Sequence, residues 1–301
     1  MPARRPLPHC TLFTGDNLQL MRRAAGGSVD LIYLDPPFNS RRHHRAPGGA
    51  EAAGAAFRDA WTPEDARTQW QDELERARPG LAQLLCAVAR RPGDRAYLLY
   101  MAVRLLQMHR LLKPEGSIYL HCDPTMSHAL KLLMDAIFGD GGADRRAPGF
   151  RNEIAWCYGL GGSSRRYYPR KHDTIFWYSK GARWFFNPPM IPATSRKLRG
   201  SQKKCPDHWN LPALNNMSKE RTGYPTQKPL ALLHRIIAAG SPPGSFILDP
   251  FCGSATTLLA AQLLHRRWCG ADLSPHATHL AARRLTRESP GCQVALRAVE
   301  G

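Results

Sequence analysis

The sequence predicts an α/β fold with a doubly wound, Rossmann-like sheet that is mostly parallel. Strand-like and helix-like segments alternate in both the first and the last part of the chain, as they do in folds with parallel sheets. The strand-like segments are almost continuously apolar, which is typical of strands covered on both faces. The chain has 301 residues, of which 43% are hydrophobic. That is enough to bury a sizeable core, and it excludes general disorder.

The individual elements follow in order along the chain. Five buried strands are expected, each closed by an aspartate, over residues 10–16, 29–35, 116–123, 245–249 and 268–272. Helices are expected over residues 94–112, 127–139, 229–240, about 255–266 and about 275–288. A turn at residues 113–116 follows the first helix, and Gly139 closes the second. Residues 40–56 are rich in Gly, Ala and Arg without periodicity, so we expect a mobile loop there.

The charge of the chain indicates a polyanionic partner. The formal net charge is +18. Nucleic acid is the simplest partner for such a chain, although a generally basic surface would give the same total. Residues 151–228 hold 15 Lys and Arg against 4 Asp and Glu and read as strands and loops. Basic residues interleaved with aromatic ones are typical of a DNA-facing surface. The candidate contacts are Arg165, Arg166, Arg170, Lys171, Arg196, Lys197, Arg199, Lys203 and Lys204.

Several classes of protein are excluded. No segment has the length of apolar chain that spans a membrane, and the first residues lack the apolar core of a signal peptide. The eight cysteines never lie within four positions of each other, which argues against a zinc ribbon or a redox pair. His43 and His44 stand among arginines and are expected to contact phosphate rather than metal. We therefore expect a cytoplasmic, nucleoid-associated protein with no bound metal and no membrane partner.

The motif Asp35-Pro36-Pro37-Phe38 follows a predicted strand, at the edge where parallel sheets bind ligands. Neither proline has an N–H, and Pro37 favours an extended Pro36. The turn therefore presents two acceptors, the Asp35 carboxylate and the Pro36 carbonyl, which suit an amino group. Phe38 adds a flat face for a planar base. An ordinary turn at the end of a strand is the alternative.

A second motif over residues 247–257 combines a strand, a tight turn and a helix. Gly253 and Ser254 allow a ligand to approach the backbone closely. Asp249 at the strand end favours an ammonium group over a phosphate, and the turn is not a dinucleotide fingerprint. Asp272 closes the next strand, where Rossmann-type folds place the carboxylate that binds ribose hydroxyls. The two acids predict a cationic nucleoside, and generic strand-end acids are the alternative.

Together these residues resemble the amino-group DNA methyltransferases of the β arrangement, which use S-adenosyl-L-methionine. Residues 35–38 match the catalytic motif of that family, 248–254 its cofactor loop and 223–229 the segment before the cofactor strand. Residues 119–124 and 152–156 match stretches between them. The catalytic motif precedes the basic region and the cofactor motif follows it, as in the family. The resemblance implies a circularly permuted methyltransferase sheet. Its parts are a catalytic half at 1–140, an inserted target-recognition region at 141–222 and a cofactor half at 223–301.

The resemblance also assigns roles to residues. Asp35, Pro36, Pro37 and Phe38 are the implied catalytic residues. The implied cofactor-binding residues are Asp16, Asp35, Thr226, Lys228, Asp249, Phe251, Gly253, Ser254 and Asp272. One position departs from the family, because Ala255 stands where a glycine is usual. Alanine is strained if the position requires a positive φ, and harmless if it requires only a small residue. We expect the second.

The implied activity is site-specific methylation of an exocyclic amine on a flipped base in duplex DNA. Adenine N6 is expected first, because an aspartate at the start of the catalytic motif is commoner among adenine enzymes. Cytosine N4 stays open. Carbon-5 methylation would require a nucleophilic cysteine, and the chain has no Pro-Cys pair. Besides double-stranded DNA, a restriction endonuclease and a second copy of the chain are candidate partners. A protein of another class is the alternative to an enzyme. It would be a non-catalytic nucleic-acid-binding protein descended from such a methyltransferase.

Overall fold

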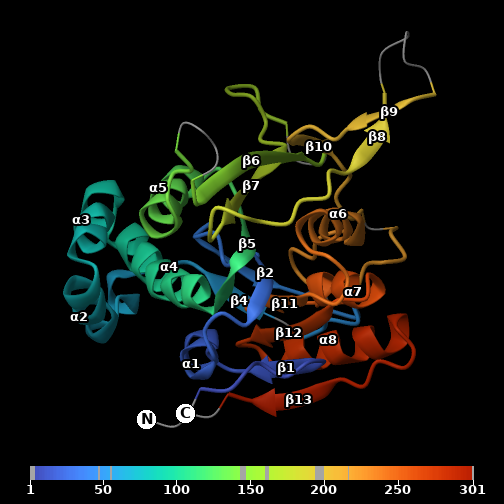
Figure 1. Cartoon of the computed structure of the whole chain (residues 1–301), viewed down its shortest axis with the longest axis horizontal. Coiled ribbons are helices and arrows are strands. Elements are labelled where there is room, and N and C mark those ends of the chain that lie inside the picture. The colour runs from blue at the N-terminus through green and yellow to red at the C-terminus, as the bar shows by residue number, and fades with distance from the viewer. Residues whose placement is uncertain are drawn as a thin grey trace.

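The computed structural model describes residues 4–46, 48–54, 56–142, 147–159, 163–193, 200–215 and 217–299. Its centre is a nine-stranded sheet in the order β10-β6-β7-β5-β2-β11-β12-β1-β13 (Figure 1). Neighbouring strands are parallel, except that β7 runs antiparallel to β5 and β6. The predicted α/β class is confirmed, with a large mixed sheet that is mainly parallel. The strands are β1 (Thr11–Thr14), β2 (Val29–Leu34), β5 (Leu112–Cys122), β6 (Gly149–Cys157), β7 (His172–Ser179), β10 (His208–Asn210), β11 (Phe246–Asp249), β12 (Arg267–Asp272) and β13 (Ala295–Ala298).

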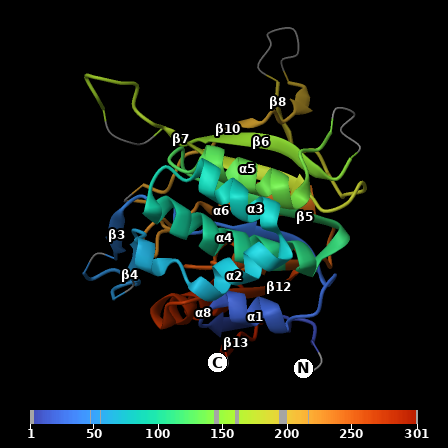
Figure 2. The ribbon, with the colours of Figure 1, turned by 90° about the vertical axis from the view of Figure 1, so that its left-hand side faces the viewer.

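Helices cover both faces of this sheet (Figures 1 and 2). One face carries α1 (Asn17–Arg23), α4 (Pro92–Leu111) and α5 (Ser127–Phe138), against which α2 (Thr68–Ala77) and α3 (Pro79–Val88) pack. The other carries α6 (Leu230–Gly240), α7 (Thr256–Leu263) and α8 (Pro275–Glu288). Among the described residues, no helix has the length and apolar character needed to cross a membrane.

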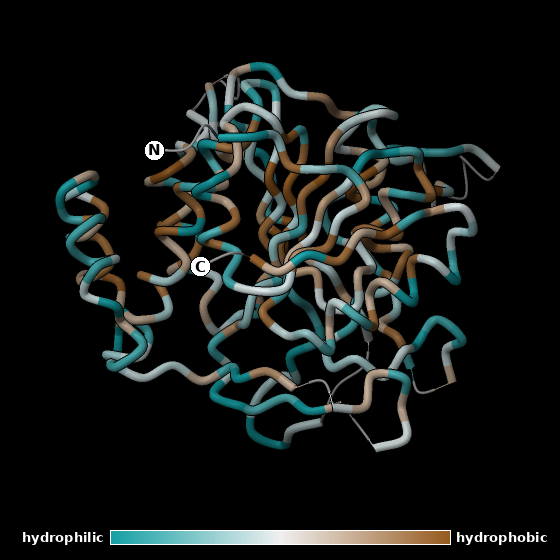
Figure 3. Tube along the Cα trace, turned by 90° about the horizontal axis from the view of Figure 1, so that it is seen from below, coloured by the Kyte–Doolittle hydropathy of each residue, from teal (hydrophilic) through white to brown (hydrophobic). Residues whose placement is uncertain are grey.

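Each face of the sheet has its own hydrophobic core. In β2, Ile32 and Leu34 belong to the core beneath α1, α4 and α5, whereas Leu31 and Tyr33 belong to the core beneath α6 and α7. This alternation follows from the two-residue period of a strand. Figure 3 shows the hydrophobic residues gathered along the central strands, with hydrophilic ones toward the periphery. The continuous apolar runs predicted as buried strands are therefore covered on both sides.

The segment expected as a loop at residues 40–56 contains a strand. β3 (Arg42–Arg45) pairs antiparallel with β4 (Ala56–Asp59) in a separate ribbon. The buried Asp59 carboxylate accepts hydrogen bonds from the backbone N–H groups of Asn39 (2.6 Å) and Ser40 (3.0 Å). These bonds fix the point where the ribbon begins. Because the ribbon is mostly exposed, its residues show no alternation of apolar and polar side chains.

The turn expected at residues 113–116 lies within a strand. β5 begins at Leu112, which pairs with Val29, and the next paired residue is Ser117, opposite Leu31. The four intervening residues face the single residue Asp30 as an irregular bulge, and Lys113 Nζ donates to Asp30 at 2.8 Å. The Pro and Gly in this stretch mark the bulge, which explains why they resemble a turn in the sequence.

The basic middle region is joined to the central sheet. β6, β7 and β10 extend that sheet, while β8 (Met190–Pro192) and β9 (Gln202–Lys204) form a separate ribbon (Figure 1). At the opposite edge, β13 was not expected, because its four residues are all exposed and carry no apolar pattern. One edge of β1 pairs with β13, and the other edge pairs with β12. The strand β1 therefore lies between two strands that come much later in the chain.

Candidate active site

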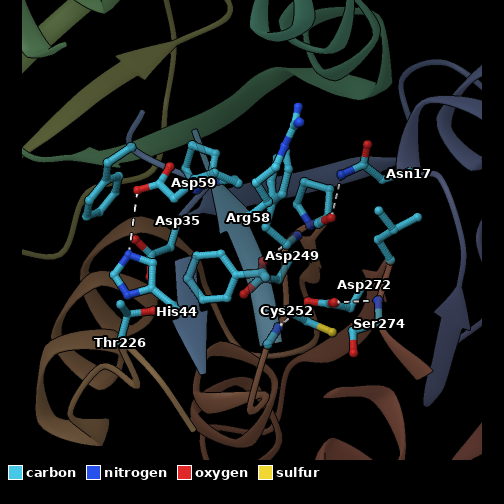
Figure 4. A pocket seen from close by; sticks show the side chains of 18 of the residues that line it. Asn17, Asp35, His44, Arg58, Asp59, Thr226, Asp249, Cys252, Asp272 and Ser274 are labelled. Atoms are coloured by element: carbon cyan, nitrogen blue, oxygen red, sulfur yellow. Dashed lines mark hydrogen bonds and ion pairs between the residues drawn. The ribbon is translucent and has the colours of Figure 1, made fainter. Parts of the chain in front are cut away.

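One cavity at the carboxyl edge of the sheet is lined, among other residues, by four aspartates that follow or end strands. Figure 4 shows three of them, Asp35, Asp249 and Asp272. Asp35 follows β2, Asp249 and Asp272 end β11 and β12, and Asp16 follows β1. These four strands are neighbours and run parallel, so their carboxyl ends lie at the same edge. The cavity has a volume of about 900 Å³. The expectation that these strand ends meet in one crevice is confirmed.

The turn after β11 is tied to the end of β12. Asp272 accepts hydrogen bonds from the backbone N–H groups of Gly253 (2.9 Å) and Ser274 (2.9 Å). Gly253 has a φ of +47°, and a Cβ atom there would lie 2.9 Å from the Tyr224 ring. Backbone and packing therefore both require glycine. Each Asp272 oxygen accepts one bond, which leaves lone pairs for a ligand. Ser254 and Phe251 also line the cavity.

Asp249 is 2% exposed, and its Oδ1 accepts a hydrogen bond from Phe251 N at 3.0 Å. Burial raises the pKa of Asp249 to about 7, and the charges of Asp35 and Asp272 act in the same direction. Burial also raises the pKa of Asp272, while its two backbone hydrogen bonds oppose that shift. A cation entering the cavity would favour the ionised form of both carboxylates. The acids thus suit a positively charged ligand.

Ala255 contradicts the expectation that its position needs only a small residue. Its backbone has a φ of 63° and a ψ of 30°, in the left-handed region, and α7 begins one residue later than expected, at Thr256. An L-residue in this conformation is strained by roughly 1 kcal/mol relative to glycine. The alanine methyl group is fully buried, so its packing offsets part of that strain.

Asp16 caps the start of α1, where its Oδ1 accepts a hydrogen bond from Leu18 N at 2.9 Å. The same oxygen accepts from Arg104 Nη2 at 2.6 Å. Arg104 is 2% exposed, donates from Nε to Asn17 Oδ1 at 2.8 Å, and lies 3.5 Å from the centre of the Tyr100 ring. The cavity wall beside β1 is therefore held by a buried arginine.

Asp35 is paired with a lysine. Lys228 Nζ donates to Asp35 Oδ2 at 2.6 Å, and the two side chains are 10% and 17% exposed. Asp35 Oδ1 is buried and has no hydrogen-bond partner among the residues that the structure describes. The Phe38 ring stacks on His121 with centres 5.8 Å apart, and Lys228 Nζ lies 5.1 Å from the Phe38 centre. Pro36 and Pro37 line the cavity beside them.

Thr226 lies at the rim of the cavity, exposed, with a φ of +62°. Its Oγ1 donates to Pro225 O at 2.6 Å. The next residue, Gln227, is anchored on both sides of its amide. Its oxygen accepts from Thr222 N at 2.9 Å, and its nitrogen donates to Glu220 O at 2.9 Å. This short segment therefore has a fixed shape just before Lys228.

A sequence model of the family described as DNA methylase, covering N6 and N4 enzymes, matches residues 29–283. The chain belongs to this DNA methylase family. S-Adenosylmethionine is the methyl donor of the family. The match spans both motifs and the basic region between them, as the resemblance implied.

Similar proteins include both adenine and cytosine enzymes of this DNA methylase family. Type II methyltransferase M.BglII from Bacillus subtilis is 24% identical over 309 residues, covering 96% of this chain and 72% of that protein. DNA adenine methyltransferase YhdJ from Escherichia coli (strain K12) is 26% identical over 294 residues, covering 91% and 82%. Two solved structures show the same fold. The M1.HpyAVI–SAM complex has a TM-score of 0.56 at 20% identity and covers 91% of this chain and 98% of that one. The cytosine-N4-specific PvuII DNA methyltransferase has a TM-score of 0.59 at 14% identity and covers 98% and 97%.

The predicted DNA contacts of this DNA methylase lie away from the cavity lining. Arg165, Arg166, Arg170, Lys203 and Lys204 are exposed, and Lys171 is half-buried and donates to Gly159 O at 3.2 Å. Arg196, Lys197 and Arg199 lie outside the described residues. The cavity is instead lined by Arg104, Lys228 and three further arginines, Arg42, Arg58 and Arg67. Arg42 lies on β3, within the segment predicted as a loop, and Arg58 lies on β4, for which no element was predicted.

Sequence reasoning missed two groups of buried polar residues in this methylase. One is Arg104, whose position within the apolar run of α4 could have signalled a buried charge partner. The other is His121, which is fully buried between Tyr33 Oη (2.8 Å from Nδ1) and Asp173 Oδ2 (3.1 Å from Nε2). Its strand was predicted, but its partner on β7 depends on the strand order of the sheet, which no local signal contains.

Proposed function

We propose that the chain transfers a methyl group from S-adenosylmethionine to the exocyclic amine of a flipped base in duplex DNA, with adenine N6 the first candidate. The observation that carries this proposal is the free Oδ1 of Asp35. This acceptor is buried, unpaired within the described part of the chain, and set beside a cavity lined by further carboxylates. An unpaired buried acceptor costs free energy, so it fits a site built to receive a donor such as an amine.

The residues of the cavity fit the methyl donor. Asp272 retains lone pairs that would accept hydrogen bonds from ribose hydroxyls. Asp249 would face the ammonium group, whose charge favours the ionised carboxylate. Phe251 and Tyr100, whose ring centres lie 6.4 Å apart, supply an apolar wall. When bound, S-adenosylmethionine would supply an electrophilic methyl group on a cationic sulfur. We retain the predicted cofactor-binding roles of Asp16, Thr226, Gly253 and Ser254.

Asp35 and Pro36 would act on the target amine. The amine is a poor nucleophile because its lone pair is delocalised into the ring. Hydrogen bonds from its two N–H groups to Asp35 Oδ1 and the Pro36 carbonyl would stabilise positive charge as it develops on nitrogen. The nitrogen–carbon bond forms while the carbon–sulfur bond breaks, and the electron pair stays on sulfur. The nitrogen then loses one proton to Asp35 or to water, and no covalent enzyme intermediate is needed.

DNA would approach from the side of the basic region and of the β3–β4 ribbon. We propose residues 141–222 as the target-recognition region, inserted between a catalytic half at 1–140 and a cofactor half at 223–301. Arg42 and Arg58 at the cavity would then face phosphates beside the flipped base. This activity takes place on the cytoplasmic nucleoid. A cognate restriction endonuclease and a second copy of the chain are its candidate partners, and the mass of the purified protein in solution tests the second.

Adenine N6 is proposed over cytosine N4 because the catalytic motif begins with aspartate. Methylating duplex DNA with the pure protein, digesting it to nucleosides and separating these by mass identifies the base directly. N6-Methyl-2′-deoxyadenosine is the expected product, and N4-methyl-2′-deoxycytidine would identify the alternative. A non-catalytic descendant would give neither product, and it would have no need for a free carboxylate at Asp35.

Asp35→Asn tests the catalytic role most directly. The amide keeps the shape and one acceptor but removes the charge that stabilises the attacking nitrogen. We expect the single-turnover rate of methyl transfer to fall by about 10²–10³-fold, because this contribution belongs to the transition state. Cofactor and DNA affinities should stay within a few-fold of the parent. A near-parental rate would show that charge at Asp35 does not activate the amine.

A further inference from the structure

We propose that Lys228 is a positioning residue for Asp35, a role that rests on the proposed methyl transfer and differs from the implied contact with the cofactor. The ammonium group of Lys228 holds one oxygen of the carboxylate, Oδ2, at 2.6 Å. The other oxygen, Oδ1, is left buried and without a partner among the described residues. The lysine therefore determines which oxygen meets the amine.

Lys228 is constrained on three sides. Besides Asp35, its Nζ donates to Thr226 O at 3.4 Å and lies 5.1 Å from the centre of the Phe38 ring. Its backbone follows Gln227, whose amide is bonded at both ends within residues 220–227. An ammonium group held in this way has few other directions in which to donate. Its direction toward Asp35 is thus built into the chain before any ligand binds.

The pairing also sets the charge of the site. Asp35 follows β2 next to β11, so it shares the cavity with Asp249, and each carboxylate disfavours the charge of the other. Burial raises the pKa of the Tyr33 phenol, and the charge of Asp35 acts in the same direction. Lys228 supplies the opposite charge in direct contact. Opposite charges are therefore in direct contact beside a second acid, and the carboxylate keeps its other oxygen for an amine.

The ion pair gives the Asp35 carboxylate a fixed orientation. A carboxylate held in this way is preorganised for the amine. Near-attack geometry contributes strongly to the rate of a transfer between two bound groups. Lys228 should therefore affect the rate of the chemical step rather than the affinity for either substrate.

Lys228→Met and Lys228→Arg test this role. Methionine keeps much of the apolar stem and removes the charge, whereas arginine keeps the charge. We expect Lys228→Met to lower the single-turnover rate by about 10²-fold, with the dissociation constant for S-adenosylmethionine within threefold of the parent. Lys228→Arg should restore most of the rate. Lys219→Met, at an exposed lysine of the same segment, is the matched control.

A double-mutant cycle with Asp35→Asn tests the interaction between Lys228 and Asp35 separately from the methyl-transfer activity. Once Asp35 carries no charge, Lys228→Met should lower the rate by less than threefold further. In thermal unfolding, Lys228→Met alone should lower the midpoint, because it leaves a buried carboxylate unpaired. Adding Asp35→Asn should restore part of that loss. This unfolding cycle reports the pairing even if the parent protein transfers no methyl group to DNA, an outcome that would overturn the proposed function alone.

Two results would overturn the positioning role. One is additive unfolding midpoints, which would mean that the two side chains do not interact. The other is a Lys228→Met protein whose affinity for S-adenosylmethionine falls more than tenfold while its rate at saturating cofactor is unchanged. That second pattern would make Lys228 a cofactor-binding residue, as the family resemblance implies.

Discussion

Asp249 makes the stability of the protein depend on pH around neutrality. Burial raises the pKa of its carboxyl from 3.8 to about 7, so the folded state holds a proton that the unfolded state has already released. The resulting stabilisation is full below the unfolded pKa and is lost as the pH rises through about 7. Asp249→Asn removes this titration. We expect the stability of the variant relative to that of the parent to rise by about 2.5 kcal/mol between pH 5 and pH 8.

Urea unfolding of parent and variant at several pH values measures this difference. Asp135→Asn is a suitable control, because Asp135 lies on α5, half-buried and paired with Lys131 at 2.7 Å. That variant should show no gain toward high pH. Parallel pH curves for Asp249→Asn and the parent would mean that Asp249 is ionised in the folded protein throughout this range.

At the scale of single residues, some features of the cavity could be predicted from the sequence and others could not. The four aspartates of the cavity could be predicted, because each closes an apolar strand. The conformation of Ala255 could not, because alanine normally avoids a positive φ and only the surrounding turn imposes it. The pairing of Lys228 with Asp35 joins residues 193 positions apart. A contact of that kind depends on the order of strands rather than on local composition.

The β3–β4 ribbon is the element whose role is least expected from its sequence. It begins at the two backbone hydrogen bonds that Asp59 accepts, directly after the turn at residues 35–38. Beyond β3, Glu51 accepts from Arg287 Nη1 of α8 at 2.8 Å. Hydrogen bonds therefore hold the chain on both sides of β3. The side chains of Arg42 and Arg45 on this strand are exposed. A fixed, positively charged strand beside the cavity is suited to hold phosphates that flank a flipped base.

Replacing Arg42 and Arg45 by alanine should weaken binding to duplex DNA and flatten its salt dependence. Each lost phosphate contact removes about 0.9 from the slope of log K against log salt concentration. Fluorescence anisotropy with labelled duplex across a salt series measures both quantities. Affinity for S-adenosylmethionine should not change. Arg297→Ala, on the exposed strand β13 at the far edge of the sheet, should leave the slope as it is. An unchanged slope in the double variant would remove the ribbon from the DNA surface.

At the scale of the whole molecule, two basic surfaces should act on one DNA. The exposed arginines Arg165, Arg166 and Arg170 belong to the middle region, and the ribbon belongs to the first part of the chain. Because the two surfaces share no residues, their effects should add. Alanine at all five arginines should lower the salt slope by up to about 4.5. If the combined variant loses no more than the ribbon variant alone, recognition by the middle region depends on other residues.

The parts of the overall architecture that could be predicted are those whose segments carry a pattern of apolar residues. The five strands that close with aspartate and the helices around them carry periodic patterns, and the structure has them within a few residues. The strands β6, β7 and β10 could be expected only as unspecified strands, because their place in the central sheet depends on pairing. The helices α1, α2 and α3 went unpredicted. In α2 and α3 only four side chains are buried, Trp70, Leu74, Leu81 and Leu85.

The position of β1 between β12 and β13 has a consequence for how the protein is made. Thr11 pairs with Cys269 on one side and with Ala295 on the other, so both neighbours leave the ribosome long after β1. At about 5–20 residues per second, β1 waits for tens of seconds with both edges unpaired. Unpaired strand edges invite association with other chains, and pairing over such a long stretch is slow. The nascent chain therefore depends on protection of β1 until β12 and β13 have emerged.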